Sequence, residues 1–217
     1  MRVIGASAHL MNPFESIGVS NEQYMLCLVK HIEVVGRTCY KSEEKITDDS
    51  YKQFVAGLIR RNHGAMLEHS SFSIKFIVDR GISHELVRHR IASFAQESTR
   101  YCNYGANGVV YIKPQFFEQN PEMLAKWFSV CELAEQQYTQ MIQAGRTPQE
   151  ARSVLPNSTK TEVIMTANFR EWRHFFNLRA ANMSGKAHPQ MLEVTRPLLS
   201  YLQSVCPIIF DDIVVKD

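Results

Sequence analysis

Apolar residues recur every three or four positions in two early segments, and this spacing predicts two amphipathic helices. The first begins after Ser20, because Ser20 and Gln23 form a capping-box pattern. The second should end near the Asn-His-Gly sequence at 62–64, since a left-handed residue commonly closes a helix. The apolar positions are Met25, Leu28, Val29 and Ile32 in the first helix, and Tyr51, Phe54, Val55, Leu58 and Ile59 in the second.

Alternation of side chains predicts strands at 72–78 and 161–167, and a shorter strand is expected at 109–113. Gly81 should end the first of these strands. Ser83 should then cap a short helix that runs to about Arg90 and continues into a loop.

Helix caps mark the later part of the chain. Asn120 followed by Pro121 is a typical helix start, and Thr147 with Glu150 forms a second capping-box pattern. Pro197 lies inside the last helix and should kink it. Helices and strands mix without regular βαβ spacing, which indicates an α+β fold. The helical segments are expected at 121–145, 148–155, 170–182 and from 189 onward.

The composition indicates a globular chain with little net charge. Of 217 residues, 45% are hydrophobic, and one domain over residues 1–217 is expected. Lysine and arginine total 24 against 22 acidic residues, so a nucleic acid partner is not expected. The chain has no long apolar run and no signal-like start, so we expect a cytoplasmic protein without a membrane partner. Five cysteines without a Cys-x-x-Cys pair favour reduced thiols and no metal site.

Hydrogen-bond donors are concentrated at residues 88–101, which read Arg-His-Arg-Ile-Ala-Ser-Phe-Ala-Gln-Glu-Ser-Thr-Arg-Tyr. Guanidinium forks and hydroxyls are the groups that bind phosphate oxygens. The segment is either a basic surface turn or an anion site. Because the positive charge is local, we favour a site for a small phosphorylated ligand over one for a polymer.

This segment resembles the signature of the flavin-dependent thymidylate synthase family, Arg-His-Arg-x-x-Ser-x-Asn-Glu-x-Ser-x-Arg-Tyr. Ala95 replaces the Asn of that pattern, Gln96 replaces its Glu, and Glu97 is a carboxylate shifted by one place. The matching positions are Arg88, His89, Arg90, Ser93, Ser98, Arg100 and Tyr101.

Further blocks resemble the same family in the expected order. The resemblance implies a single domain with a mixed or antiparallel sheet flanked by helices. The blocks are His63–His69, Ala151–Pro156, Asn168 with Arg170, Leu178 with Arg179, and His188 with Gln190.

The resemblance implies an enzyme that converts dUMP to dTMP by reductive methylation. In this family 5,10-methylenetetrahydrofolate supplies the carbon, FADH2 supplies the hydride and NADPH regenerates the reduced flavin. The family assembles as a homotetramer with active sites at subunit interfaces. Because dUMP and the diphosphate of FAD are both anions, compact arginine forks suit both ligands.

The family's functional residues carry over by position. Arg179 would act in catalysis, because a guanidinium at the pyrimidine edge stabilises negative charge there. Ala65 lies where relatives have a hydroxyl, and His174 where some have Asn. The FAD-binding residues would be His63, Ala65, Arg88, His89, Arg90, Gln96, Asn168, Arg170 and His174. The dUMP-binding residues would be Glu85, Leu86, Val87, Arg88, Gln96, Glu97, Ser98, Thr99, Arg100, Arg152 and Arg179.

Three other interpretations remain open. A non-catalytic nucleotide- or flavin-binding module would keep the phosphate site without turnover, and the replaced Asn and Glu support it. His63, Glu68 and His69 suggest zinc, but they lack the His-Glu-x-x-His order, and His69 is expected to be buried. Cys102 follows an arginine and a tyrosine and could act as a thiolate nucleophile, a role that the family does not use.

Overall fold

The computed structural model describes residues 1–216, which form two compact units. Unit 1 comprises residues 1–7, 76–89 and 94–164, and unit 2 comprises residues 8–75, 90–93 and those from 165 onward. The chain passes from one unit to the other within four of its strands. The expectation of one domain over residues 1–217 stays a prediction.

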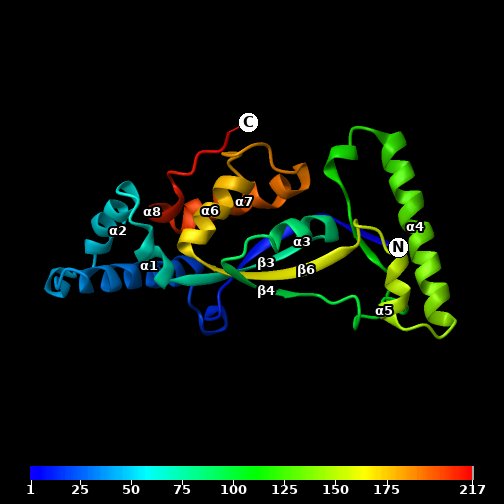
Figure 1. The fold of residues 1–217 in the computed structure, drawn as a ribbon, viewed down its shortest axis with the longest axis horizontal. Coiled ribbons are helices and arrows are strands. Elements are labelled where there is room, and N and C mark those ends of the chain that lie inside the picture. The colour runs from blue at the N-terminus through cyan, green and yellow to red at the C-terminus, as the bar shows by residue number, and fades with distance from the viewer. Residues whose placement is uncertain (217) are drawn as a thin grey trace. The chain divides into compact units, whose positions relative to one another are not determined.

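The strands form two sheets. The larger has the order β2-β3-β6-β4 (Figure 1), and the smaller pairs β1 with β5 in parallel, with Arg2 opposite Val110. Alternate residues of β3 and of β6 are buried, which confirms the expected alternation. The strands are β1 (Arg2–Ile4), β2 (Ser7–Met11), β3 (Ser71–Asp79), β4 (Ala92–Gln96), β5 (Val110–Ile112) and β6 (Lys160–Asn168).

The helices flank these sheets, and the expected α+β class with a mixed or antiparallel sheet is confirmed. None of the helices within residues 1–216 combines the length and the apolar composition that a membrane crossing requires. The α-helices are α1 (Asn21–Thr38), α2 (Ser50–Arg60), α3 (Arg80–Leu86), α4 (Pro121–Gln143), α5 (Pro148–Ala151), α6 (Phe169–Arg179), α7 (Pro189–Val205) and α8 (Pro207–Phe210). Short 3₁₀ turns span Glu15–Ile17, Glu43–Lys45, Gly64–His69, Gln115–Phe117 and Arg152–Val154.

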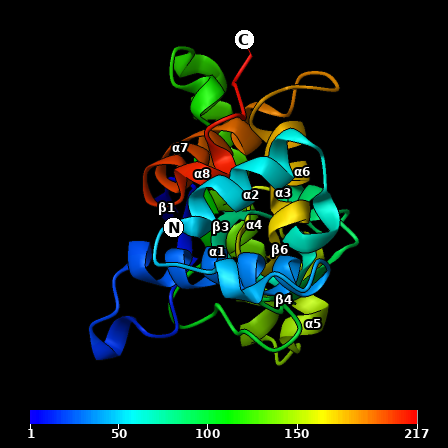
Figure 2. The ribbon, with the colours of Figure 1, turned by 90° about the vertical axis from the view of Figure 1, so that its left-hand side faces the viewer.

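Aromatic side chains form the core of unit 2. Phe72 stacks on Trp172 with ring centroids 5.2 Å apart, and the Trp172 indole N–H donates to the Phe72 carbonyl at 3.2 Å. Phe169, Phe176 and Phe210 complete the cluster. Around this core α2 lies against both α1 and α8 (Figure 2). The predicted capping box of α1 is present, which confirms where that helix begins.

A smaller core holds unit 1 together. Tyr111, Cys131 and Tyr138 are buried there, and Trp127 and Met141 of α4 pack against them. These α4 side chains therefore serve packing in unit 1. Burial raises the pKa of the Cys131 thiol.

The connection between β3 and β4 differs from the expectation. The helix α3 begins at Arg80 rather than after Ser83, because Asp79 Oδ1 accepts a hydrogen bond from the Ile82 N–H at 2.7 Å and caps the helix. It ends at Leu86 rather than near Arg90, and residues 92–96 form a strand rather than a loop. The small and polar residues of this edge strand show no strand pattern in the sequence. Its extended conformation is selected by pairing with β6.

Other element boundaries also differ from those expected from the sequence. The helix α6 ends at Arg179 rather than Asn182, whose φ of 56° reverses the chain. The short elements β1, β2 and α8 were not predicted, because segments of three to five residues show too little periodicity to be recognised.

Candidate functional site

A hollow of about 440 Å³ in unit 1 is lined by Arg80, Thr99, Gln149 and Arg152. The first turn of α3 supplies Arg80, and the 3₁₀ turn after α5 begins with Arg152. Two guanidinium groups and a hydroxyl therefore face one space. This donor set suits an anion of phosphate type.

The predicted phosphate ligands Thr99 and Arg152 lie together in this hollow. Arg152 Nη1 donates to Thr99 Oγ1 at 3.1 Å, although 53 residues separate the two in the chain. Thr99 is only 4% exposed, whereas Arg152 is exposed. The contact holds one N–H of the guanidinium and leaves its other donors for a ligand.

Arg80 is a candidate that the sequence analysis missed. Its backbone N–H donates to the carbonyl oxygens of Asn157 and Thr159 at 2.9 and 3.1 Å, which ties the start of α3 to the wall of the hollow. Its side-chain Nη1 is buried and has no hydrogen-bond partner within residues 1–216. A buried charged donor without an acceptor is costly, so an anion in the hollow would satisfy it. Only the position of this arginine at the end of a strand could have indicated it.

Ser98 and Arg100 lie on a tight turn beside Thr99. The Ser98 carbonyl accepts hydrogen bonds from the N–H groups of Tyr101 and Cys102, and Ser98 Oγ accepts one from the Arg100 N–H at 3.3 Å. The Ser98 hydroxyl proton therefore remains for a ligand. The Arg100 guanidinium lies 5.4 Å from the Tyr101 ring centroid and is exposed.

Gln96 and Glu97 have partners inside unit 1. Gln96 Nε2 donates to Ser83 Oγ at 3.0 Å and to Thr161 Oγ1 at 3.2 Å, which uses both amide protons. Only its carbonyl oxygen is left for a ligand, and the expected contacts of Gln96 with FAD and dUMP stay predictions.

Glu97 is held by a cation and a phenol. It accepts hydrogen bonds from Lys160 Nζ at 2.9 Å and from the Tyr104 hydroxyl at 2.7 Å. Burial lowers the pKa of Lys160, but contacts with Glu162 and Glu97 outweigh burial and raise it overall. Burial, followed by the Glu97 contact, raises the pKa of Tyr104. Glu97 thus orients the start of the turn at residues 98–102, and its contact with dUMP stays a prediction.

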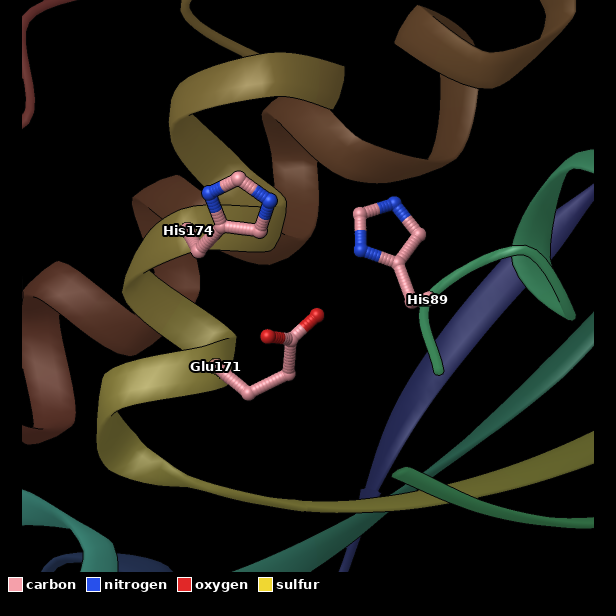
Figure 3. Close-up of side chains that lie close together, drawn as sticks. All are labelled: His89, Glu171 and His174. Atoms are coloured by element: carbon pink, nitrogen blue, oxygen red, sulfur yellow. The ribbon is translucent and has the colours of Figure 1, made fainter. Parts of the chain in front are cut away.

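Residues 85–90 lie after or at the end of α3. Leu86 is fully buried, so this residue reaches a ligand only through its backbone. Glu85 is half-buried, and Val87 and Arg88 are exposed. His89 is 5% exposed and follows α3 (Figure 3), whereas the exposed Arg90 belongs to unit 2.

Three predicted flavin residues of unit 2 lie in or beside the 3₁₀ turn Gly64–His69, namely His63, Ala65 and Arg170. Asn62 has a φ of 56° and reverses the chain after α2, leaving His63 exposed. Arg170 Nη1 forms an ion pair with Glu68 at 2.5 Å, and a Cβ on Gly64 would lie 3.0 Å from Arg170 Nε. Because Gly64 has no Cβ, the Arg170 side chain can lie against the backbone of the turn. Ala65 and His69 are both exposed, so the expectation that His69 is buried is wrong.

The remaining predicted residues lie on α6. Asn168 caps this helix, because its Oδ1 accepts a hydrogen bond from the Glu171 N–H at 2.9 Å. One turn separates Glu171, which is buried, from His174, which is exposed (Figure 3). Arg179 ends the helix, where its carbonyl accepts a hydrogen bond from Thr195 Oγ1 at 2.6 Å. No sequence pattern indicated the buried carboxylate of Glu171, because an acidic residue in the first turn of a helix is usual.

The comparisons with known proteins agree on one family. The family model described as thymidylate synthase complementing protein (Thy1) matches residues 24–208. A flavin-dependent thymidylate synthase of Geobacter sulfurreducens is 30% identical over 188 residues, which cover 83% of this chain and 80% of the relative. One of Mycolicibacterium gilvum is 31% identical over 199 residues, covering 83% of this chain and 78% of the relative.

A solved structure shows the same fold. The UMP/dUMP methylase PolB of Streptomyces cacaoi, bound with 5-Br dUMP, superposes with a TM-score of 0.76 at 22% identity, covering 97% of this chain and 96% of that one. The extent of the family match and the identity to these relatives show that this chain belongs to the Thy1 family of flavin-dependent thymidylate synthases.

Proposed function

We propose that this protein is an FAD-dependent thymidylate synthase. It would convert dUMP to dTMP, taking the carbon from 5,10-methylenetetrahydrofolate and the hydride, through FADH2, from NADPH. The observation that carries this proposal is the hollow of unit 1, where Arg80 and Arg152 face the same space and a buried guanidinium nitrogen has no partner within residues 1–216. The 5-Br dUMP bound to PolB and the flavin dependence of the sequence relatives support the same ligands.

The hollow would hold the dUMP phosphate. Arg80, Arg152 and the Ser98 hydroxyl would donate to its oxygens, and Arg100 would add positive charge from the adjacent turn. A phosphate bound in this way would fix the position of the pyrimidine. Holding the reacting ring in the productive geometry lowers the barrier, an effect beyond the affinity itself. Arg179 would stabilise the negative charge that develops on the ring as C5 attacks the methylene carbon.

The donor set fits a flavin dinucleotide. Arg88, Arg90 and His63 are exposed and supply two guanidinium forks and an imidazole, which suit a diphosphate and a polar ring edge. Arg170 would contribute through the nitrogens that Glu68 does not hold. Bound FAD would supply the hydride that reduces the transferred methylene to a methyl group.

We further propose that the active sites form at the subunit interfaces of a homotetramer. So many of the proposed ligand-binding side chains are exposed in one chain that a second chain would be needed to exclude water from the reaction. The residues concerned are His63, Arg88, Arg90, Arg100, Arg152 and His174.

The visible absorption spectrum of the purified protein tests the proposal. We expect a bound oxidised flavin whose absorption bands shift when dUMP is added, and dTMP formation once NADPH and 5,10-methylenetetrahydrofolate are present. Flavin and dUMP binding without dTMP formation would instead support the non-catalytic module. A protein that binds neither ligand would contradict both.

Replacing Arg88 with alanine is expected to remove most of the bound FAD while leaving the fold intact. An exposed arginine adds little to a core, but a charge-assisted contact with a diphosphate is worth about 1.5–3 kcal/mol. The flavin-to-protein ratio after gel filtration measures the loss, and circular dichroism checks the fold. Arg146→Ala, which removes another exposed arginine from unit 1, is the control and should retain FAD. Full FAD retention in Arg88→Ala would remove this residue from the site.

Replacing Cys102 with serine is expected to preserve most of the NADPH-dependent dTMP formation. Cys102 is half-buried at the end of the turn at residues 98–102, and its backbone N–H donates to the Ser98 carbonyl at 3.0 Å. A serine at position 102 keeps this backbone hydrogen bond. The proposed reaction uses no protein nucleophile. A variant that binds FAD and dUMP but forms no dTMP would show that the thiolate attacks the pyrimidine.

A further inference from the structure

A second hollow of about 440 Å³ lies in unit 2, between the end of α1, the 3₁₀ turn Glu43–Lys45 and α2. Four cationic side chains line it, and none of them belongs to the proposed dUMP or FAD sites. Its volume falls in the range of pockets that bind small molecules. The cations are Arg37, Lys45, Arg60 and Arg61.

One of the four cations is neutralised within the protein. Glu33 is 2% exposed and accepts hydrogen bonds from Arg37 Nε at 3.1 Å and Nη2 at 2.9 Å. Its other oxygen accepts a hydrogen bond from Ser50 Oγ at 2.8 Å. The Arg37 guanidinium also lies over one face of the Phe54 ring, 4.6 Å from the ring centroid. Glu33 therefore fixes Arg37 and has no oxygen left for another cation.

The other three cations have no such counter-charge. Within residues 1–216 the side chains of Lys45, Arg60 and Arg61 make no hydrogen bond or ion pair. Of the nearby acids, Asp49 is already paired with Lys52 at 2.6 Å, and Glu43 and Glu44 are exposed on the same 3₁₀ turn as Lys45. Three like charges around one hollow repel one another, and a bound anion would relieve that repulsion.

The backbone of α2 leaves room for one of these cations. A Cβ on Gly57 would lie 3.4 Å from Arg61 Nη2, so the Arg61 guanidinium lies close along the helix at this glycine. Arg60, Arg61 and Lys45 thus line a hollow whose wall at Gly57 has no side chain. This combination suits a phosphate group, which accepts paired N–H donors on several oxygens.

We propose that this hollow, formed by Lys45, Arg60, Arg61 and the Arg37–Glu33 pair, binds a phosphate group of a small molecule. The site goes beyond the proposed function and does not depend on it. Its ligand carries either a diphosphate or a terminal phosphate monoester, and both chemistries use the same donors. Arg61 lies two residues before His63 in the chain, so the diphosphate of FAD is the competitor that an experiment has to exclude.

Isothermal titration calorimetry on the protein alone, and again with FAD and dUMP in excess, tests the proposal. We expect saturable binding of inorganic pyrophosphate or of 2′,5′-ADP, which separates a diphosphate from a phosphate monoester. Arg60→Ala combined with Arg61→Ala should weaken that binding at least about tenfold, the effect of losing roughly one charged contact. Lys52→Ala removes a charge from the same helix outside the hollow and should change the affinity less than about twofold, because solvent screens it.

Four outcomes would overturn the proposal. The first is no saturable binding of either probe to the protein alone. The second is equal weakening by Lys52→Ala, which would reduce the effect to overall charge. The third is loss of pyrophosphate binding on saturation with FAD, which would assign the hollow to the flavin. The last is binding of triglutamate, a carboxylate probe, in place of both phosphates. Because the titration follows binding alone, absence of dTMP formation would contradict the proposed function and leave this result unchanged.

Discussion

Replacing Arg179 with alanine is expected to lower the rate of dTMP formation by about a hundredfold or more, while FAD stays bound. Loss of one preorganised group that stabilises charge in a transition state costs about 3 kcal/mol. The end of α6 should keep its place, because Thr195 Oγ1 bonds to the backbone carbonyl of Arg179 and not to its side chain. The lost rate would therefore report on the guanidinium itself.

The kcat for dTMP, measured together with flavin content and dUMP affinity, separates catalysis from binding. Arg179→Lys is the matched variant, since it keeps the charge without the planar fork, and it should recover only part of the rate. A wild-type kcat in either variant would show that Arg179 does not act on the pyrimidine. An alanine variant that loses FAD would move its role to the flavin site.

Replacing Arg152 with alanine is expected to weaken dUMP binding by about ten- to a hundredfold. The variant loses a charge-assisted contact with the phosphate, worth about 1.5–3 kcal/mol, and leaves the Thr99 hydroxyl without its donor. The fold should persist, because Arg152 is exposed on a 3₁₀ turn. FAD content should not change, since none of the proposed flavin residues lines this hollow.

Equilibrium titration with dUMP and with deoxyuridine makes this test specific for the phosphate. The variant should lose affinity for dUMP but not for deoxyuridine, which has no phosphate. Arg146 is an exposed arginine shortly after the end of α4, so Arg146→Ala is the control and should bind dUMP as the wild type does. Equal losses of affinity for dUMP and for deoxyuridine in Arg152→Ala would place Arg152 against the base or sugar instead.

Local chemistry explains which elements the sequence alone predicted. The capping box at Ser20, the Asn120-Pro121 helix start and the alternation in β3 each depend on residues within a few positions of one another. Their conformations follow from short-range hydrogen bonds and from the burial of one face. The signature at 88–101 and its companion blocks likewise identified the family, and the comparisons confirmed it.

Only the tertiary structure decided how the candidate site is built. Arg80, Thr99 and Arg152 come from separate segments, and the hollow exists because backbone bonds from Arg80 join α3 to residues 157–159. No local pattern reveals that Gln96 turns its amide inward or that Glu97 pairs with Lys160.

The same physical reason covers both groups of features. Caps, alternation and motifs belong to neighbours in the chain, so the sequence by itself determined the main helices, the central strands and the family. Contacts between distant segments form only when the chain folds, because each depends on the geometry of every element between them. For this reason the buried nitrogen of Arg80 and the cations around the second hollow, unpaired within residues 1–216, became visible only in the folded structure.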